Sequence, residues 1–112
     1  MILEGCKITS FSDEQGAWGD VLGFGSVACA WLNWDTWAEG GRCWPAYERG
    51  TRIRAWFMHE GKLMRYWGVI QDYGKGHVVG AGQVEPWRWF DLWLPESFQV
   101  LDLEGRVEVI GK

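Results

Sequence analysis

Residues 50–70 read GTRIRAWFMHEGKLMRYWGVI, and side chains of two kinds alternate along the first half of this stretch. One set of alternating positions holds Thr51, Ile53, Ala55 and Phe57. A period of two is typical of a strand that buries one face. Glu60-Gly61 at the centre suits a tight turn, because Gly adopts positive φ without steric strain. We therefore predict an antiparallel hairpin with strands over residues 51–58 and 63–70.

The length of the turn fixes which residues face each other. A loop of Glu60 and Gly61 places His59 opposite Lys62. The predicted ladder then continues through Phe57–Met64, Trp56–Arg65, Ala55–Tyr66 and Arg54–Trp67. Two Arg–Trp pairs thus share one side of the ribbon, where a guanidinium over an indole contributes roughly 0.5–1 kcal/mol when exposed. With the neighbouring arginine they form what we call the basic-aromatic face: Arg52, Arg54, Trp56, Arg65 and Trp67.

Composition indicates one folded domain over residues 1–112. Hydrophobic residues make up 47% of the chain, which is enough for a core without metal or disulfide support. Sixteen Gly without a repeat indicate turns and bulges between short strands. Ten Trp exceed what a core of this size needs, so some of them are expected at a groove or an interface.

Charge is unevenly distributed along the chain. The net charge of −4 argues against non-specific binding of nucleic acid. Residues 42–65 nevertheless carry six basic and two acidic side chains, whereas residues 1–41 carry one basic and six acidic ones. The hairpin is therefore a basic region in an acidic protein, and neutralisation by the acidic flanks is its simplest explanation.

The cysteines and the hydropathy bear on location. Cys6, Cys29 and Cys43 are odd in number and show no C-x-x-C spacing. No signal peptide and no apolar run long enough for a membrane span is evident. These features predict a cytoplasmic protein with reduced thiols and no membrane partner.

The segments before the hairpin leave one ambiguity. Residues 1–11 suit a first strand with a bulge at Gly5, and residues 13–16 suit a turn. Residues 18–25 hold too many Gly for a helix. Residues 26–39 suit either a helix with Trp31 and Trp34 on one face, or a strand over 27–32 followed by a turn. Residues 40–45 suit a loop.

The segments after the hairpin also read as short strands. Residues 71–76 suit a second turn and residues 77–79 a returning strand. Residues 86–94 suit either a short helix that begins at Pro86, or a strand with Phe90, Leu92 and Leu94 on one side. Residues 98–103 and 107–110 alternate around Glu104-Gly105, which predicts a closing hairpin.

This order predicts a mainly β fold, as a small rolled sheet or barrel with at most one or two short helices. Residues 50–86 resemble the strand–turn–strand core of SH3-like barrels, Tudor domains included, through Gly, Tyr and alternation. The resemblance covers about a third of the chain and implies an SH3-like barrel. It carries no site residues over.

The basic-aromatic face is the first candidate binding site. Indole planes beside guanidinium groups suit nucleobases and phosphates, and they equally suit the hot spot of a protein interface. The alternative is a structural ladder on the outside of a barrel. The second candidate is the series Trp31, Trp34 and Trp37, which is either core or a partner surface.

Signatures of catalysis are few. The chain has two histidines, His59 and His77, and a dyad of His77 with Cys29 or Cys43 has no local motif behind it. His59-Glu60 lacks the second His of an H-E-x-x-H zinc site, and no Gly-rich phosphate loop is present. We therefore expect no catalytic residues, no metal and no cofactor.

The resulting expectation is a small non-catalytic binding protein. We expect a protein–protein interaction module, an inhibitor or adaptor of the kind that viruses and mobile elements encode, with the basic-aromatic face as its surface. The first alternative is a β-barrel that binds a nucleotide or single-stranded nucleic acid. The second is a small enzyme that uses His77. Self-association is a further option.

Overall fold

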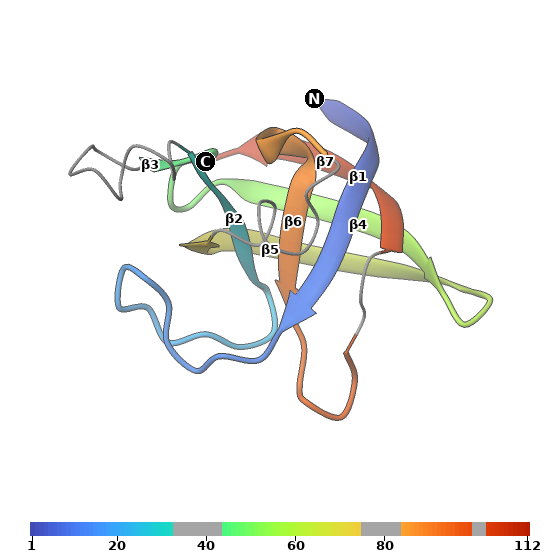
Figure 1. The fold of residues 1–112 in the computed structure, drawn as a ribbon, viewed down its shortest axis with the longest axis horizontal. Coiled ribbons are helices and arrows are strands. Elements are labelled where there is room, and N and C mark those ends of the chain that lie inside the picture. The colour runs from blue at the N-terminus through green and yellow to red at the C-terminus, as the bar shows by residue number, and fades with distance from the viewer. Residues whose placement is uncertain (33–43, 75–83, 100–102) are drawn as a thin grey trace.

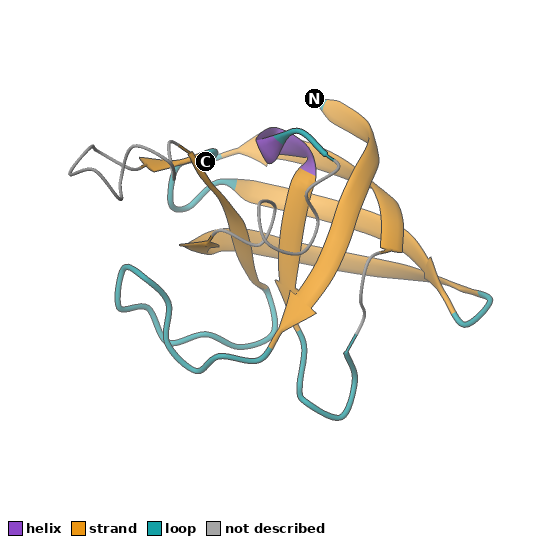
Figure 2. Cartoon of the chain, viewed as in Figure 1, coloured by secondary structure: helices purple, strands orange, loops and turns teal. Residues whose placement is uncertain are grey.

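The computed structural model describes residues 1–32, 44–74, 84–99 and 103–112, and most of these residues lie in β-strands (Figure 1). One short 3-10 helix, η1, precedes the sixth strand (Figure 2). The elements in chain order are β1 (Ile2–Phe11), β2 (Ser26–Leu32), β3 (Trp44–Pro45), β4 (Arg52–His59), β5 (Lys62–Gly74), η1 (Pro86–Arg88), β6 (Trp89–Trp93) and β7 (Leu103–Gly111).

Six of the strands close into a barrel. The order β2-β5-β4-β7-β1-β6 returns to its start because β6 also pairs with β2, and β3 adds two residues at the edge of β2. Pairings β1–β6 and β2–β5 are parallel, whereas β4–β5, β4–β7, β1–β7 and β2–β6 are antiparallel. The prediction of a mainly β, small rolled barrel is confirmed.

The predicted hairpin is confirmed together with its register. Arg54 faces Trp67, Trp56 faces Arg65, and His59 faces Lys62. Glu60 and Gly61 both have positive φ, 52° and 78°, which is the type I′ turn that matches the twist of a two-stranded ribbon. The tip of this hairpin projects past the other strands at the right of Figure 1.

The inner positions of the hairpin are buried, as the alternation predicts: Thr51, Ile53, Ala55 and Phe57. They join a core to which all six barrel strands contribute. Its fully buried side chains include Ile8, Val27, Ile53, Ile70, Phe90, Leu92 and Val107. Removing such a side chain from water contributes roughly 1.5–3 kcal/mol each, so this interior is the main source of stability.

Two expectations for the first part of the chain are confirmed and one is displaced. Gly5 has φ 65° and lies in a register shift of β1 against β7, as a bulge requires. The strand alternative holds for residues 26–32. The turn predicted at residues 13–16 lies slightly later, at residues 16–19, because Gln15 already bridges Val21.

Two predicted turns are wrong. Residues 71–74 continue β5 because β2 runs parallel to them, and Gln71 finds a partner there when Ser26 Oγ donates to its Oε1 at 2.7 Å. Residues 104–105 continue β7, where Gly105 faces Phe57 on β4 and Cys6 on β1. Both stretches are polar or Gly-containing, and pairing with distant strands outweighs that local preference.

Residues 86–94 combine both alternatives, because η1 is followed by β6. Phe90, Leu92 and Leu94 are buried in the core, as the strand alternative predicts. Trp89 is buried on the opposite side of β6, whereas Trp87 is 46% exposed. The predicted features at residues 33–43 and 75–83, including the strand at 77–79, lie outside the described residues.

Candidate functional site

The basic-aromatic face lies on the outer side of the β4–β5 ribbon, and its first half is assembled as predicted. The Arg54 guanidinium carbon lies 5.1 Å from the centre of the Trp67 ring, and Trp67 is 62% exposed. Arg54 Nη1 also lies 3.4 Å from Glu108 Oε1 on β7. Arg52, Arg54 and Trp67 together line a shallow hollow of about 270 Å³. The guanidinium therefore packs over an indole that is otherwise largely exposed to water.

The second half of the face is arranged differently. Trp56 is half-buried and Arg65 is exposed, and within the described residues they form no stacked pair although they are register partners. Trp56 instead lies opposite Arg106 of β7 and lines a separate hollow of about 470 Å³ with Met58 and Leu63. The structure thus brings Arg52, Arg54 and Trp67 together and leaves Trp56 and Arg65 outside that group.

Strand β7 supplies neighbours that the sequence did not suggest. Arg106, Glu108 and Ile110 lie beside the ribbon because β7 pairs with the outer edge of β4. The only signal in the sequence is the alternation of residues 107–110, and alternation does not say which strand is the partner. Because β4 and β7 are far apart in the sequence, no local sequence pattern reveals that they pair.

Part of the positive charge of the hairpin region is neutralised by distant acids. Arg49 pairs with Asp20 through two contacts, and Arg54 Nη1 lies 3.4 Å from Glu108 Oε1. The structure thus shows acids from both ends of the chain beside the basic residues, as the charge distribution suggests. In the described parts of the chain, Lys62 and Arg65 have no carboxylate within ion-pair distance.

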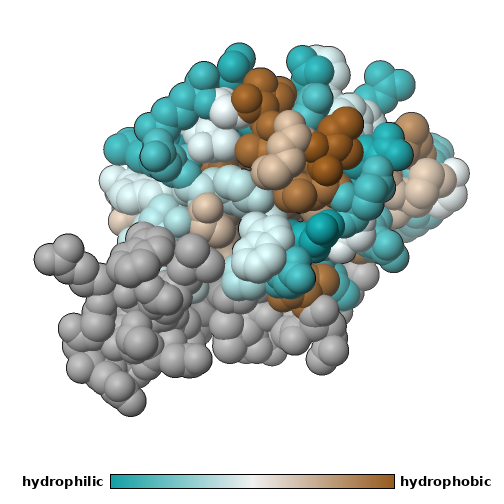
Figure 3. Space-filling view, turned by 90° about the horizontal axis from the view of Figure 1, so that it is seen from above, coloured by the Kyte–Doolittle hydropathy of each residue, from teal (hydrophilic) through white to brown (hydrophobic). Residues whose placement is uncertain are grey.

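Apolar side chains also reach the surface. The space-filling view from above shows brown apolar surface among teal hydrophilic side chains (Figure 3). On the projecting hairpin the exposed ones are Met58 and Leu63, which face each other across the ladder at 54% and 59% exposure. Apolar area left in water on the outside of a sheet is a common mark of an interaction surface.

A third, more apolar hollow of about 400 Å³ lies beside β5. We call it the apolar groove. Its lining includes no carboxylate, and the residues are Phe24, Phe57, Met64, Arg65, Tyr66, Leu94, Pro95 and Phe98. Phe98 also contacts the His59 ring at 5.1 Å between centres, so the groove reaches the hairpin tip.

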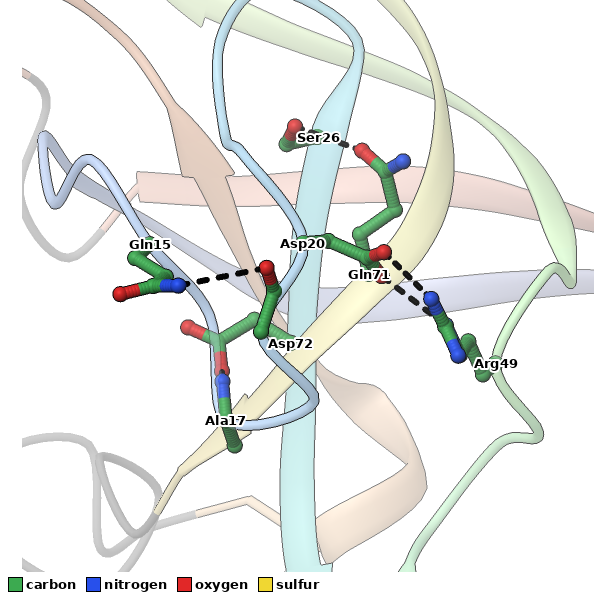
Figure 4. A network of polar contacts seen from close by, with 8 residues as sticks. Gln15, Ala17, Asp20, Ser26, Arg49, Gln71 and Asp72 are labelled. Carbon is green, nitrogen blue, oxygen red and sulfur yellow. Dashed lines mark hydrogen bonds and ion pairs between the residues drawn. The ribbon is translucent and has the colours of Figure 1, made fainter.

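A polar network holds the loop of residues 12–25 against β5. Asp72 Oδ1 accepts from the backbone N–H of Ala17 at 2.7 Å, Arg49 pairs with Asp20, and Gln71 accepts from Ser26 Oγ at the start of β2, just after the loop (Figure 4). Partial burial raises the pKa of Asp72, and burial together with nearby Asp72 and Asp13 raises the pKa of Asp91 to about 7. Asp91 accepts from Thr9 Oγ1 at 2.8 Å.

Asp72 and Asp91 lie on either side of Ala28, one on each neighbouring strand. Two carboxyls with raised pKa resemble an acid–base pair, but donors of the protein already occupy an oxygen of each. Within the described residues, no group of three or more His, Cys, Asp or Glu side chains is placed to hold a metal ion. Both carboxyls therefore have a structural role. Asp72 holds the loop of residues 12–25 against β5, and Asp91 joins β6 to β1.

The other residues considered for chemistry are either inert or outside the described part. Burial raises the pKa of Cys6 and of Cys29 to about 11, so at neutral pH both free thiols stay protonated and weakly nucleophilic. Cys43, His77, Trp34 and Trp37 lie outside the described residues. Trp31 lies on a strand and packs edge-on against Tyr73 at 5.6 Å, so it does not start the helical Trp stripe.

No protein-family model matches the chain, and comparisons with curated proteins and with solved structures find no match either. The resemblance to SH3-like barrels therefore stays an expectation. No helix in the described part of the chain has the length and apolar composition needed to cross a membrane.

Proposed function

We propose that the protein is a non-catalytic binding module, of the inhibitor or adaptor type, that recognises another protein through the outer side of the β4–β5 ribbon. The observation that carries this proposal is Trp67, an indole 62% exposed and held in place by the Arg54 guanidinium 5.1 Å away. An exposed apolar side chain that is already held in one position loses little conformational entropy when a partner buries it.

The surroundings of Trp67 favour a protein partner. Exposed Met58 and Leu63 and the half-buried Trp56 extend the apolar area along the ribbon. Trp and Arg are the residue types that dominate the hot spots of protein interfaces. The arginines around this area would form its polar rim.

A nucleotide or single-stranded nucleic acid is the second candidate ligand, favoured by Arg65, which has no carboxylate partner among the described residues. Against it, Glu108 beside Arg54 and Glu4 beside Arg106 put negative charge on the same face. Salt separates the two ligands, because phosphate contacts weaken steeply as salt is added, whereas a Trp-centred protein interface weakens less.

The test compares Trp67→Ala with Arg54→Ala. The partner is first identified by affinity capture from the native host, and Kd is then measured by calorimetry. We expect Trp67→Ala to weaken binding by about 2 kcal/mol or more, roughly thirtyfold, because it removes the exposed apolar plane. Arg54→Ala should weaken it less, since the indole remains.

The matched control is Trp87→Ala, which removes another exposed indole, on η1 and away from the ribbon. It should leave Kd unchanged. Unfolding by denaturant should show that Trp67→Ala alters stability by no more than about 1 kcal/mol, as for an exposed pair. A large loss of stability with unaltered Kd would make the basic-aromatic face structural and overturn the proposal.

A further inference from the structure

One edge of β5 lacks a neighbouring strand over half of its length. β4 pairs with β5 from Lys62 to Val69, but β2 pairs with the other edge only from Val69 onward. Within the described residues, no other strand pairs with Lys62–Gly68. This segment belongs to the hairpin that projects past the barrel (Figure 1).

The hairpin register shows which backbone groups this open edge presents. In a two-residue hairpin the flanking pair, His59 and Lys62, exchanges backbone hydrogen bonds, and every second pair after it does the same. The N–H and C=O groups of Leu63 and Arg65 therefore point away from β4. Further along, Val69 N–H donates outward to the Gly25 carbonyl at 2.8 Å, whereas Ile70 N–H donates toward β4, to Thr51, at 2.8 Å.

The apolar groove lies directly beside this open edge. Met64, Arg65 and Tyr66 of β5 form one wall, and Phe24, Leu94 and Phe98 line the rest. Phe24 is 75% exposed and Phe98 is 37% exposed, so apolar area is available to a ligand. A volume of about 400 Å³ accommodates one or two large side chains.

We propose that the open edge of β5 and the apolar groove together form a peptide-binding site, in which an extended segment of another protein adds to the sheet as a strand. The backbone of that segment would pair with Leu63 and Arg65, and its alternate apolar side chains would enter the groove. In strand addition, main-chain hydrogen bonds supply affinity and side-chain pockets supply specificity.

Charge identifies the chemistry of the segment. Lys62 and Arg65 flank the edge without a carboxylate partner in the described parts of the chain, and the groove lining contains no acid. The segment therefore carries Asp or Glu between its apolar residues. A second copy of this chain fits poorly, because an antiparallel pairing of two β5 edges centred on the open segment would place Arg65 opposite its own copy.

This site goes beyond the proposed function and does not depend on the Trp67 surface. Leu63 and Arg65 belong to both sites, and here they contribute their outward backbone groups and, for Arg65, its charge. Trp67→Ala therefore tests the first proposal alone, whereas the comparison of Leu63→Pro with Leu63→Ala isolates the edge N–H that only the second proposal uses.

The experiment selects ligands from a random decapeptide library by mRNA display on the whole protein. We expect the selected peptides to alternate apolar and acidic residues. Leu63→Pro removes one edge N–H, whereas Leu63→Ala keeps it and controls for the side chain. Leu63→Pro should bind the best synthetic peptide about tenfold more weakly than Leu63→Ala does, and Phe24→Ala should also weaken binding. Trp67→Ala should leave the affinity for the peptide unchanged.

A ligand-side measurement covers the case in which Leu63→Pro fails to fold. N-methylation of the peptide backbone should abolish binding at one set of alternate residues and be tolerated at the other, because only one set faces β5. The proposal is overturned if no peptide is enriched, if both sets of N-methyl peptides bind equally, or if Leu63→Pro and Leu63→Ala bind alike. Sedimentation that shows dimers of the free protein, lost in Leu63→Pro, would make a second copy the occupant and also overturn it.

Discussion

At the scale of single residues, the hydroxyl of Tyr66 joins three segments. It accepts from Gly25 N–H at 2.9 Å and lies 3.0 Å from the Ser26 carbonyl and 2.9 Å from the Trp93 carbonyl. The phenol has one hydrogen, so the two carbonyls share it. Burial raises the pKa of Tyr66 to about 12, which keeps that hydrogen in place at any physiological pH.

We predict that Tyr66→Phe lowers the free energy of unfolding by about 1–3 kcal/mol, because it leaves partly buried backbone groups without partners. Urea unfolding measures the loss. Tyr73→Phe is the control, since the described structure gives the Tyr73 hydroxyl no hydrogen bond and its ring packs on Trp18. Equal losses in both variants would mean that the ring, and not the hydroxyl, supplies the stability.

Asp91 makes stability depend on pH. Burial raises the pKa of this carboxyl from about 3.8 to about 7, so the folded protein keeps the proton that the unfolded chain releases above pH 4. Stability is therefore greatest below pH 4 as far as Asp91 is concerned, falls between pH 4 and 7, and is level above pH 7. Asp72, whose pKa burial also raises, contributes in the same direction.

We predict that Asp91→Asn reduces this dependence. Asn keeps an oxygen that accepts from Thr9 but cannot ionise, so the variant should gain about 2 kcal/mol over the parent between pH 5 and pH 8. Urea unfolding of both proteins at both pH values gives the difference. An identical pH dependence in the two proteins would show that Asp91 is ionised in the fold at neutral pH.

At the scale of elements, β7 is continuous because Gly105 lets three strands approach closely. A Cβ at this position would lie 2.7 Å from the Trp56 carbonyl oxygen and 2.9 Å from Ile8 Cγ1. The first contact is with backbone, which no side-chain rotation relieves. Gly105 is therefore needed for close packing between β4 and β1, and not for the turn that its neighbourhood suggests.

We predict that Gly105→Ala costs about 1–3 kcal/mol of stability, the usual effect of overpacking. The control is Gly23→Ala, in a loop where a Cβ would meet nothing within 4 Å. Thermal unfolding should show a lower Tm for the first variant and little change for the second. Equal Tm values would mean that β4 and β7 accommodate the extra methyl group without loss of stability, and would contradict the close packing inferred at Gly105.

The strand pairing that the sequence predicts correctly is local. The β4–β5 hairpin follows from alternation and a Glu-Gly turn, and its register fixes the Arg54–Trp67 pair. The extension of β5 to Gly74 and the continuity of β7 depend on β2, β1 and β4, which are distant in sequence. Local composition cannot show such pairings, so residues 71–74 and Glu104-Gly105 resemble turns.

The same distinction holds for the candidate sites. Arg52, Arg54 and Trp67 are adjacent because of the hairpin alone, and the structure brings them together as expected. The position of Trp56 depends on β7, which draws it into a different hollow. The apolar groove depends on residues from three regions of the chain, among them Phe24, Met64 and Phe98. No pattern in the sequence joins those regions.

At the scale of the whole molecule, an acidic protein presents basic side chains on its projecting hairpin. The net charge is −4, yet Lys62 and Arg65 have no acidic partner in the described parts of the chain. An acidic body that ends in a basic tip has a dipole, which orients it toward negatively charged partners during encounter. Both proposed sites lie on the β4–β5 hairpin.

The closure of the barrel through β1 has a consequence for biosynthesis. Thr9 of β1 bonds Asp91 of β6 across 82 residues, and Met1 bonds Val109 across 108 residues. Both neighbours of β1, the earliest strand of the barrel, are therefore the last strands of the barrel to be translated. Before β6 and β7 are synthesised, Leu3 and Ile8 of β1 have no strand to bury them and are accessible to chaperones that bind nascent apolar segments. The barrel thus closes only when translation of these strands is finished, whereas the β4–β5 hairpin can form well before.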